Sequence, residues 1–350
     1  PRPIRHPQDS TGHRPRVGRP RLDFPTRGHF GRLPKPHPSR TRPPAGGRAL
    51  SKTAFMIQPR HHLALAAIGL SLLLGSAHPL LAQAELQRHT VEADGHPIAV
   101  WEKSPADPEG VIVLIHGRTW SSLPDFDLQV PGEELSLMDG LAAEGFATYA
   151  IDLRGYGGTP RDETGWLTPN RAYRDVVEVL LWVAERTGGP PALFGWSNGS
   201  MVSQLTAQRS GHLLSALILF GYPVRPEVDW RDLEPEVEEP PRIPTTAMAA
   251  ASDFIVPGSI SKAAVDEYVR HALEADPVRA DGRELATWAE LDASSVLAPT
   301  LLIQGEHDPL ALSENQAAFF WKLGTPDRTR VTIPGGDHAA HLESPRATFI

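Results

Sequence analysis

The segment Gly195-Trp196-Ser197-Asn198-Gly199 has the residue types and spacing that point most clearly to chemistry in this 350-residue sequence. A predicted strand, 192–194, leads into it, and a predicted helix, 199–209, follows it. A tight turn in this position exposes a serine hydroxyl, and the flanking glycines let neighbouring backbone approach closely. The start of the helix favours developing negative charge at the same point. The context predicts that Ser197 is a catalytic nucleophile.

A serine hydroxyl needs a general base to take its proton. The sequence offers one late in the chain, where Gly335-Gly336-Asp337 precedes His338. We predict that His338 is the base. The alternative is His341, three residues further on, with His338 only capping a loop.

The imidazole of such a base needs a carboxylate that fixes its tautomer and stabilises its cation. Asp308 follows the predicted strand 300–304 and is the predicted partner, with Glu306 as the alternative. The resulting order of Ser197, Asp308 and His338 differs from the orders in the two main serine protease folds.

Acyl transfer also needs hydrogen-bond donors for the oxyanion. We predict that they are the backbone N–H groups of Asn198, which follows the nucleophile, and of Arg118, in the loop after the predicted strand 111–115. We interpret His116 as structural. The side chain of Arg118 either holds an anionic substrate group or is solvated or paired with a carboxylate of the cap.

The rest of the chain predicts the framework that positions these residues. Short β-branched runs alternate with helical patterns, which is typical of a parallel sheet covered by helices. The acidic, proline-rich entry to residues 224–292 and the helical patterns after it predict an inserted cap of about that extent. The final helix looks truncated at Ile350. The predicted strands are 86–93, 98–103, 111–115, 147–153, 192–194, 214–220, 300–304 and 330–333, and the predicted helices are 137–145, 170–187, 199–209, 262–275, 283–291 and 313–323.

The first 84 residues carry a different signal. Residues 1–55 are basic and proline-rich without apolar periodicity, and we interpret them as disordered and as a non-native upstream extension. Residues 56–84 have the basic start, short apolar run and A-x-A site of a signal peptide, which predicts translation from Met56, cleavage after Ala84 and a secreted or periplasmic protein. The apolar run is shorter than a membrane span requires.

The predicted mature chain, residues 85–350, carries 20 basic and 40 acidic residues. This balance argues against nucleic acid or an anionic membrane as a partner, and we expect no membrane span in the mature chain. The absence of cysteine excludes disulfides and thiolate chemistry. No His-Glu-x-x-His motif is present, so we expect neither a metal nor a cofactor. The oligomeric state is open.

Five motifs together resemble the α/β-hydrolase superfamily over about residues 86–349. They are His116-Gly117, Asp152–Thr159, Gly195–Gly199, Gly305-x-x-Asp308, and Gly336-Asp337-His338 followed by Glu343. The resemblance implies an eight-stranded, mostly parallel sheet flanked by helices, with a helical cap over the site. It also implies that Asp152–Thr159 is structural. Dehalogenases and epoxide hydrolases of this fold use an aspartate nucleophile, and the serine at position 197 argues against both.

The sequence therefore predicts a serine hydrolase that acts on a small-molecule carboxylic ester through an acyl-enzyme. The same three side chains also suit lactones, amides, carbon–carbon bond cleavage or perhydrolysis. The alternative of a different class is a non-catalytic binding protein on the same scaffold.

Overall fold

The computed structural model describes residues 84–344 and 346–350. The predictions for residues 1–55 and for the signal peptide lie outside the described residues, apart from Ala84. No helix in the described part of the chain is both long enough and apolar enough to cross a bilayer.

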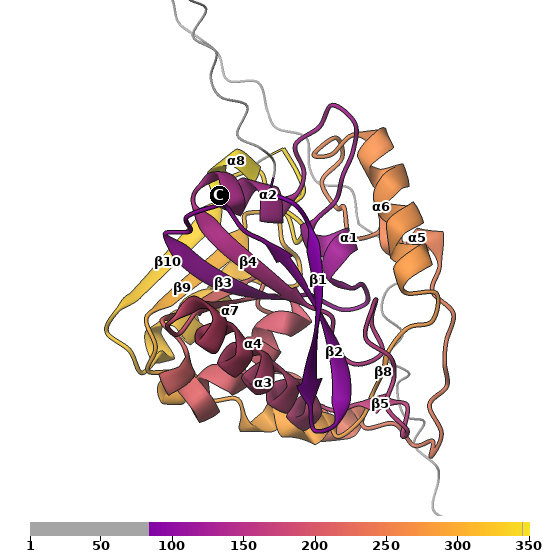
Figure 1. Ribbon diagram of the computed structural model, residues 1–350. Helices are drawn as coiled ribbons and strands as arrows, with labels where there is room; N and C mark the ends of the chain where they lie inside the picture. The colour runs from indigo at the N-terminus through magenta and orange to yellow at the C-terminus, as the bar shows by residue number, and fades with distance from the viewer. Residues whose placement is uncertain (1–83, 345) are drawn as a thin grey trace, which may run out of the picture. The chain divides into compact units, whose positions relative to one another are not determined.

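Eight strands form one sheet in the order β1-β2-β4-β3-β6-β7-β9-β10 (Figure 1). β1 and β2 are antiparallel, as are β2 and β4, and every other neighbouring pair is parallel. The predicted eight-stranded, mostly parallel sheet is confirmed. The strands are β1 (Gln87–Ala93), β2 (His96–Lys103), β3 (Gly110–Ile115), β4 (Phe146–Ile151), β6 (Ala192–Trp196), β7 (Ala216–Phe220), β9 (Thr300–Gly305) and β10 (Arg328–Ile333), and the two-residue strands β5 (Trp166–Leu167) and β8 (Asp281–Gly282) pair separately.

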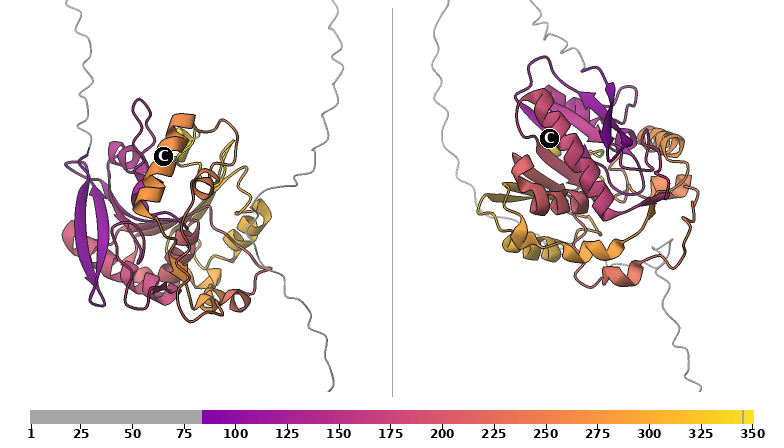
Figure 2. Two further views of the ribbon diagram at one scale, coloured as in Figure 1. Left: turned by 90° about the vertical axis from the view of Figure 1, so that its right-hand side faces the viewer. Right: turned by 60° about the horizontal axis from the view of Figure 1, so that its bottom comes forward.

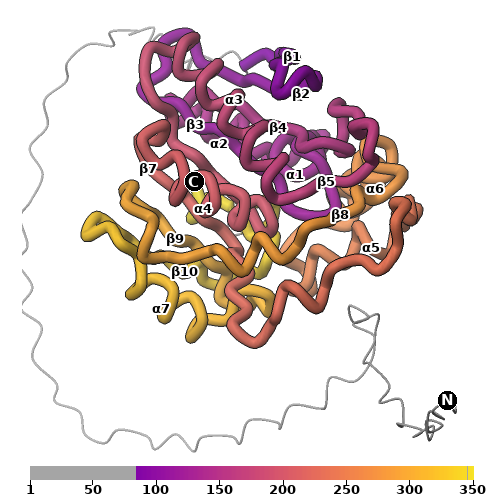
Figure 3. The backbone as a smooth tube through the Cα atoms, turned by 90° about the horizontal axis from the view of Figure 1, so that it is seen from below, coloured from indigo at the N-terminus to yellow at the C-terminus, as the bar shows by residue number. Residues whose placement is uncertain are grey.

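Helices cover both faces of the sheet, as Figure 1 and the view from below in Figure 3 show. Side chains of α3, α4 and α7 belong to the core on one face, and side chains of α1, α2 and α8 belong to the core on the other. The helices are α1 (Ser122–Phe126), α2 (Leu137–Ala143), α3 (Pro169–Thr187), α4 (Asn198–Ser210), α5 (Ala247–Ala251), α6 (Lys262–Ala275), α7 (Ser313–Lys322) and α8 (Arg346–Phe349).

Helix α3 illustrates how local sequence signals set an element. The side chain of Thr168 accepts a hydrogen bond from the Arg171 N–H, Pro169 occupies the first turn, and Gly188 ends the helix in a left-handed conformation. Ala172, Val176, Val179, Leu180 and Val183 are buried along one side, as their spacing predicts.

Residues 224–292, which we call the inserted segment, lie between β7 and β9 and contain α5, α6 and β8 (Figure 2). The predicted helix 262–275 matches α6. The predicted helical run 283–291 is a 3₁₀ segment, Leu285–Glu290. Tyr268 of α6 is fully buried in a small apolar cluster that includes Trp120 and Leu128.

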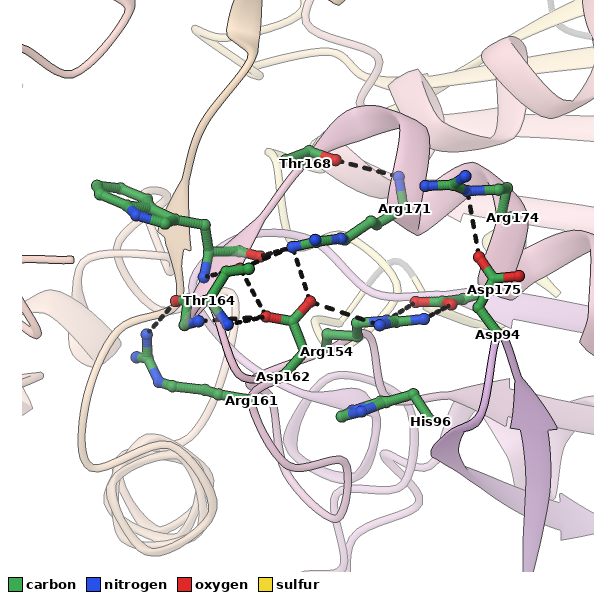
Figure 4. Close-up of polar contacts among 12 residues, drawn as sticks. Asp94, His96, Arg154, Arg161, Asp162, Thr164, Thr168, Arg171, Arg174 and Asp175 are labelled. Atoms are coloured by element: carbon green, nitrogen blue, oxygen red, sulfur yellow. Dashed lines mark hydrogen bonds and ion pairs between the residues drawn. The ribbon is translucent and has the colours of Figure 1, made fainter. Parts of the chain in front are cut away.

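A buried group of charges ties the loop after β4 to the surrounding elements (Figure 4). The guanidinium of Arg154 donates two hydrogen bonds to Asp175 of α3, at 2.8 and 2.7 Å, and a third to the Ala93 carbonyl, at 3.1 Å. Its remaining terminal nitrogen lies 3.4 Å from Asp162, which also pairs with Arg171 at 2.7 Å. We call this set the Arg154 cluster.

Candidate active site

Ser197 occupies the turn between β6 and α4 in a strained conformation. Its φ of 54° and ψ of −119° lie in the left-handed half of the map, which residues with a Cβ rarely adopt. The turn packs so closely that a Cβ on Gly199 would lie 2.3 Å from the Ile115 carbonyl oxygen. Only glycine fits there, which accounts for the second glycine of the motif. Ser197 itself is partly exposed.

Hydrogen bonds to β7 hold the strained turn in place. The Ser197 N–H donates to the Phe220 carbonyl at 2.9 Å, and the Ser200 N–H donates to the Ser197 carbonyl at 2.9 Å. The buried Ser200 hydroxyl lies 2.6 Å from the Gly195 carbonyl oxygen and 2.9 Å from that of Phe220. The cost of the unusual backbone is thus offset by contacts that a relaxed turn would lose.

Asp308 and His338 form a buried pair beside the same strand end. The Nδ1 of His338 donates to Oδ2 of Asp308 at 2.8 Å. The other oxygen of Asp308 accepts the N–H groups of Leu310, at 2.8 Å, and Ala311, at 3.2 Å, which fixes the carboxylate. The carbonyl of His338 accepts a hydrogen bond from the Trp196 indole at 2.7 Å.

Gly221 makes room for this pair. It follows Phe220 at the end of β7, and its φ is +57°. A Cβ at this position would lie 3.0 Å from two ring atoms of His338 and 3.3 Å from Oδ2 of Asp308. Because Phe220 also accepts the Ser197 N–H, the end of β7 lies against both the Ser197 turn and the Asp308–His338 pair.

The electrostatics of the pair favour proton uptake. Burial alone lowers the pKa of His338, but the charge and hydrogen bond of Asp308, together with the charges of Asp253 and Asp337, outweigh it. The pKa of His338 therefore lies above its ordinary value of 6.5. The Nε2 atom forms no hydrogen bond with any other described residue, Ser197 included. Such contacts often tighten only when substrate binds.

The alternatives to this pair are placed elsewhere. His341 is buried, donates through Nε2 to the Asp125 carbonyl at 2.9 Å, and has its pKa lowered to about 3 by burial. Glu306 accepts from the Gly335 N–H at 2.9 Å, and its side chain is 54% exposed. Neither group contacts the Ser197 turn through a hydrogen bond in the described residues.

His116 has both ring nitrogens engaged. Its Nδ1 donates to the Gly117 carbonyl at 2.7 Å, and its Nε2 accepts from the Leu153 N–H at 3.1 Å. Burial, the largest influence, lowers its pKa. This pattern fits a neutral ring that joins the ends of β3 and β4, in agreement with its interpretation as structural.

The two predicted oxyanion donors lie on either side of Ser197. Asn198 is the first residue of α4, so its N–H is one of the four that a helix leaves without an internal acceptor. Arg118 follows Gly117, whose Cα faces the nucleophile, since a Cβ there would lie 3.2 Å from the Ser197 Cβ. Both residues line one open pocket with a cavity volume of about 50 Å³.

The described residues contain no group of three or more His, Asp or Glu side chains placed to hold a metal ion.

The arrangement of Ser197, Asp308 and His338 supports transfer of an acyl group to an activated serine, with Nε2 of His338 as the proton acceptor.

A family profile described as serine aminopeptidase, S33, matches residues 106–345, more than two thirds of the chain. The chain belongs to this family of α/β hydrolases. Comparison with curated protein sequences gave no significant match.

Solved structures confirm the fold of this S33-family hydrolase. The thioesterase domain from the curacin biosynthetic pathway is 20% identical, with a TM-score of 0.54, over 75% of this chain and 98% of that one. A thermophilic esterase from Thermogutta terrifontis is 19% identical, with a TM-score of 0.54, over 75% and 95%. The epoxide hydrolase VrEH1 from Vigna radiata is 19% identical, with a TM-score of 0.52, over 75% and 95%. At such identities the likeness concerns the fold alone.

The sequence reasoning did not find the residues by which the inserted segment of this hydrolase contacts the histidine loop. The carboxylate of Asp337 accepts the N–H groups of Ile255 and Val256 at 2.6 and 2.7 Å, and Glu343 accepts the Ser259 hydroxyl at 2.6 Å. Asp337 belongs to the predicted Gly336-Asp337-His338 motif, but no sequence pattern predicted that it binds the Ile255 and Val256 N–H groups.

Asp253 was also missed. It accepts hydrogen bonds from the Trp120 indole at 2.9 Å and the Tyr268 hydroxyl at 3.2 Å, and its charge acts on His338. Burial raises the pKa of Asp253 to about 6. The same tyrosine hydroxyl also lies 3.0 Å from Oδ1 of Asp125, whose pKa burial likewise raises. No motif surrounds Asp253, so only the three-dimensional path of the inserted segment reveals it.

Proposed function

We propose that this hydrolase cleaves carboxylic esters, with Ser197 as nucleophile, His338 as general base and Asp308 as the residue that orients the histidine. The observation that carries the proposal is the strained, partly exposed Ser197 near a buried Asp308–His338 pair whose Nε2 has no hydrogen-bond partner among the described residues. Buried carboxylate–imidazole pairs of this kind activate serine hydroxyls in several unrelated folds.

Ser197 Oγ attacks the ester carbonyl while its proton passes to Nε2 of His338, and the N–H groups of Asn198 and Arg118 bind the oxyanion. The tetrahedral adduct then collapses, the ester C–O bond breaks, and His338 returns the proton to the leaving alcohol. Water, deprotonated by the same nitrogen, releases the carboxylic acid and restores Ser197.

Covalent labelling tests this assignment directly. A fluorophosphonate probe, which phosphonylates activated serines, is expected to add one adduct to wild-type protein by intact mass and none to Ser197→Ala. Peptide mapping should place the adduct on Ser197. An adduct on another serine would contradict the assignment of Ser197 as the nucleophile. No adduct on folded protein would contradict the proposal and favour a binding protein on this scaffold.

A substrate panel then separates esters from the other reactions open to the same site. 4-Nitrophenyl esters, lactones and aminoacyl anilides are compared by kcat/KM on one preparation. Faster cleavage of esters than of anilides by orders of magnitude is the expected result. A preference for the anilides would replace the ester by an amide as the substrate.

The predicted export stays a prediction. N-terminal sequencing of protein recovered from the medium or periplasm of a secreting host tests it, and a mature chain beginning at Glu85 is the expected result.

A further inference from the structure

The pocket beside the proposed oxyanion donors has an apolar interior. Arg118 and Asn198 line this open pocket, whose cavity volume is about 50 Å³, together with Val202, Leu285 and Trp288. The last two side chains come from the 3₁₀ segment of the inserted segment. Because both proposed donors line it, the pocket lies where part of a substrate bound at those donors would extend.

Arg118, an exposed residue, lines this pocket, and the partly buried Arg279 directly precedes the lining residue Ala280. The side chain of Arg118 forms no hydrogen bond or ion pair with another residue of the described ranges, and neither does that of Arg279. The Nε atom of Arg279 is buried and lacks a partner in the same residues. The backbone next to this side chain is held firmly, since the Arg279 N–H donates to the Ile243 carbonyl at 2.9 Å and Ala280 lines the pocket.

The two guanidinium groups are near enough to repel each other. Burial is the first cause that lowers the pKa of Arg279, and the charge of Arg118 is the second. Both cations also act on Tyr156, a buried residue of the pocket whose hydroxyl has no hydrogen-bond partner among the described residues. Arg118 and Tyr156 thus line the pocket, and the charge of Arg279 lies near enough to act on both.

The nearby carboxylates, Asp281 and Asp276, form their hydrogen bonds with groups other than the Arg279 side chain. Asp281 attracts Arg279 but forms its contacts with Arg161, at 3.0 Å, and with the Arg242 N–H, at 3.2 Å. Asp276 accepts the N–H groups of Ser121 and Gly157, at 2.8 and 2.9 Å. A partly buried cation without a partner is costly, and a bound anion removes that cost.

We propose that Arg118, Arg279 and Tyr156 form a subsite for a carboxylate carried by the substrate, so that the preferred substrate is an ester with an apolar chain ending in a negative charge. The inference rests on the proposed function, which it makes specific. Guanidinium groups suit carboxylates because their planar N–H donors match the two oxygens.

Two matched pairs of esters test the subsite. The first pair is the 4-nitrophenyl half-ester of adipic acid and the same ester of adipic acid monoamide, which differ only in the charge at the acyl end. The second pair is the butyrate ester of 4-hydroxybenzoate and that of 4-hydroxybenzamide, with the charge on the alcohol. In at least one pair, kcat/KM for the anion should exceed that for the amide about tenfold or more.

Variants assign the preference to the arginine. Arg279→Gln should reduce the ratio of anionic to neutral ester by about tenfold, mainly through KM. Arg283→Gln is the matched control, because it removes the same charge from the inserted segment. Arg283 instead stacks on Trp166 and donates to the Glu238 carbonyl. The control should keep the wild-type ratio. An equal loss in both variants would reduce the effect to general electrostatics and overturn the subsite.

A binding measurement keeps this test separate from that of the proposed function. Calorimetric titration with hexanoate, a carboxylate on an apolar chain, is expected to show binding to wild type and to Arg283→Gln, and about tenfold weaker binding to Arg279→Gln. Neutral ester turnover without anion preference or hexanoate binding would overturn the subsite alone. Hexanoate binding without labelling of Ser197 would overturn the proposed function alone. Circular dichroism checks that Arg279→Gln is folded.

Discussion

The Asp308–His338 pair and the Arg154 cluster each join a buried carboxylate to a nitrogen-bearing side chain. They differ in whether a nitrogen is left without a hydrogen-bond partner in the described residues. In the Arg154 cluster, every terminal nitrogen of Arg154 has an acceptor in Asp175, Asp162 or the Ala93 carbonyl (Figure 4). In the Asp308–His338 pair, the carboxylate is equally well fixed, but only one ring nitrogen forms a hydrogen bond, and the other has no partner in residues 84–344 and 346–350. A closed network can only stabilise the fold, whereas an open one retains a site for proton transfer.

The largest effect is expected from removing the free nitrogen. His338→Ala should lower kcat by roughly 10⁵- to 10⁶-fold, since triads of this kind act as a unit. The free energy of unfolding should change by only about 0.5–3 kcal/mol, the usual range for a single substitution. Ester kinetics and urea denaturation on one preparation compare the two. If His338→Ala unfolded the protein without lowering turnover per folded molecule, the Asp308–His338 pair would be structural, like the Arg154 cluster.

A smaller loss should follow from keeping the ring and removing the carboxylate. Asp308→Asn is expected to lower kcat by about 10⁴-fold, because the amide no longer selects the reactive tautomer. The negative charge of Asp308 raises the pKa of His338, so its loss lowers that pKa. Residual activity, which needs the neutral ring, should then persist to lower pH than in wild type. An unshifted acidic limb in the pH profile of kcat/KM would place another group beside His338.

The Arg154 cluster should respond in the opposite manner. Arg154→Met leaves the charge of Asp175 buried and unpaired, which is expected to cost about 3–5 kcal/mol of unfolding free energy. Turnover per folded molecule should remain close to wild type. Replacing both partners, as Arg154→Met with Asp175→Leu, should restore much of the stability.

An exposed pair is the matched control for this effect. Lys262 and Asp266 of α6 form an ion pair, but their side chains are 85% and 64% exposed. Lys262→Ala should leave stability nearly unchanged, because water screens such pairs. Equal losses in the buried and exposed variants would mean that burial does not set the strength of the Arg154 cluster.

The smallest effect is expected when the negative charge of Asp253 is removed. Asp253 is charged above its pKa of about 6, and there its charge favours the protonated form of His338. Asp253→Asn removes this stabilisation, lowers the pKa of His338 and should move the acidic limb of kcat/KM to lower pH. The plateau at high pH should stay near wild type. An acidic limb that moves to higher pH would contradict this sign.

Local patterns were sufficient to predict most of the framework. The cap and apolar stripe of α3, the β-branched run of β3 and the turn at Ser197 each depend on neighbours in sequence, and each is found where it was predicted. The pairing of Asp308 with His338 was predicted from the position of Asp308 directly after the strand 300–304. Asp253 and Arg279 were not predicted, because their roles depend on how the inserted segment folds back over residues far away in sequence.

The hydrogen bonds from the Ile255 and Val256 N–H groups to Asp337 limit how the inserted segment can be exchanged between related proteins. The residue that anchors the inserted segment is the immediate neighbour of His338, and Glu343, whose pKa burial raises to about 7, binds the same segment through Ser259. A chimera that receives residues 224–292 from another protein therefore breaks the support of the histidine loop unless residues 337–343 are transplanted with them. Segment and loop form one interchangeable module.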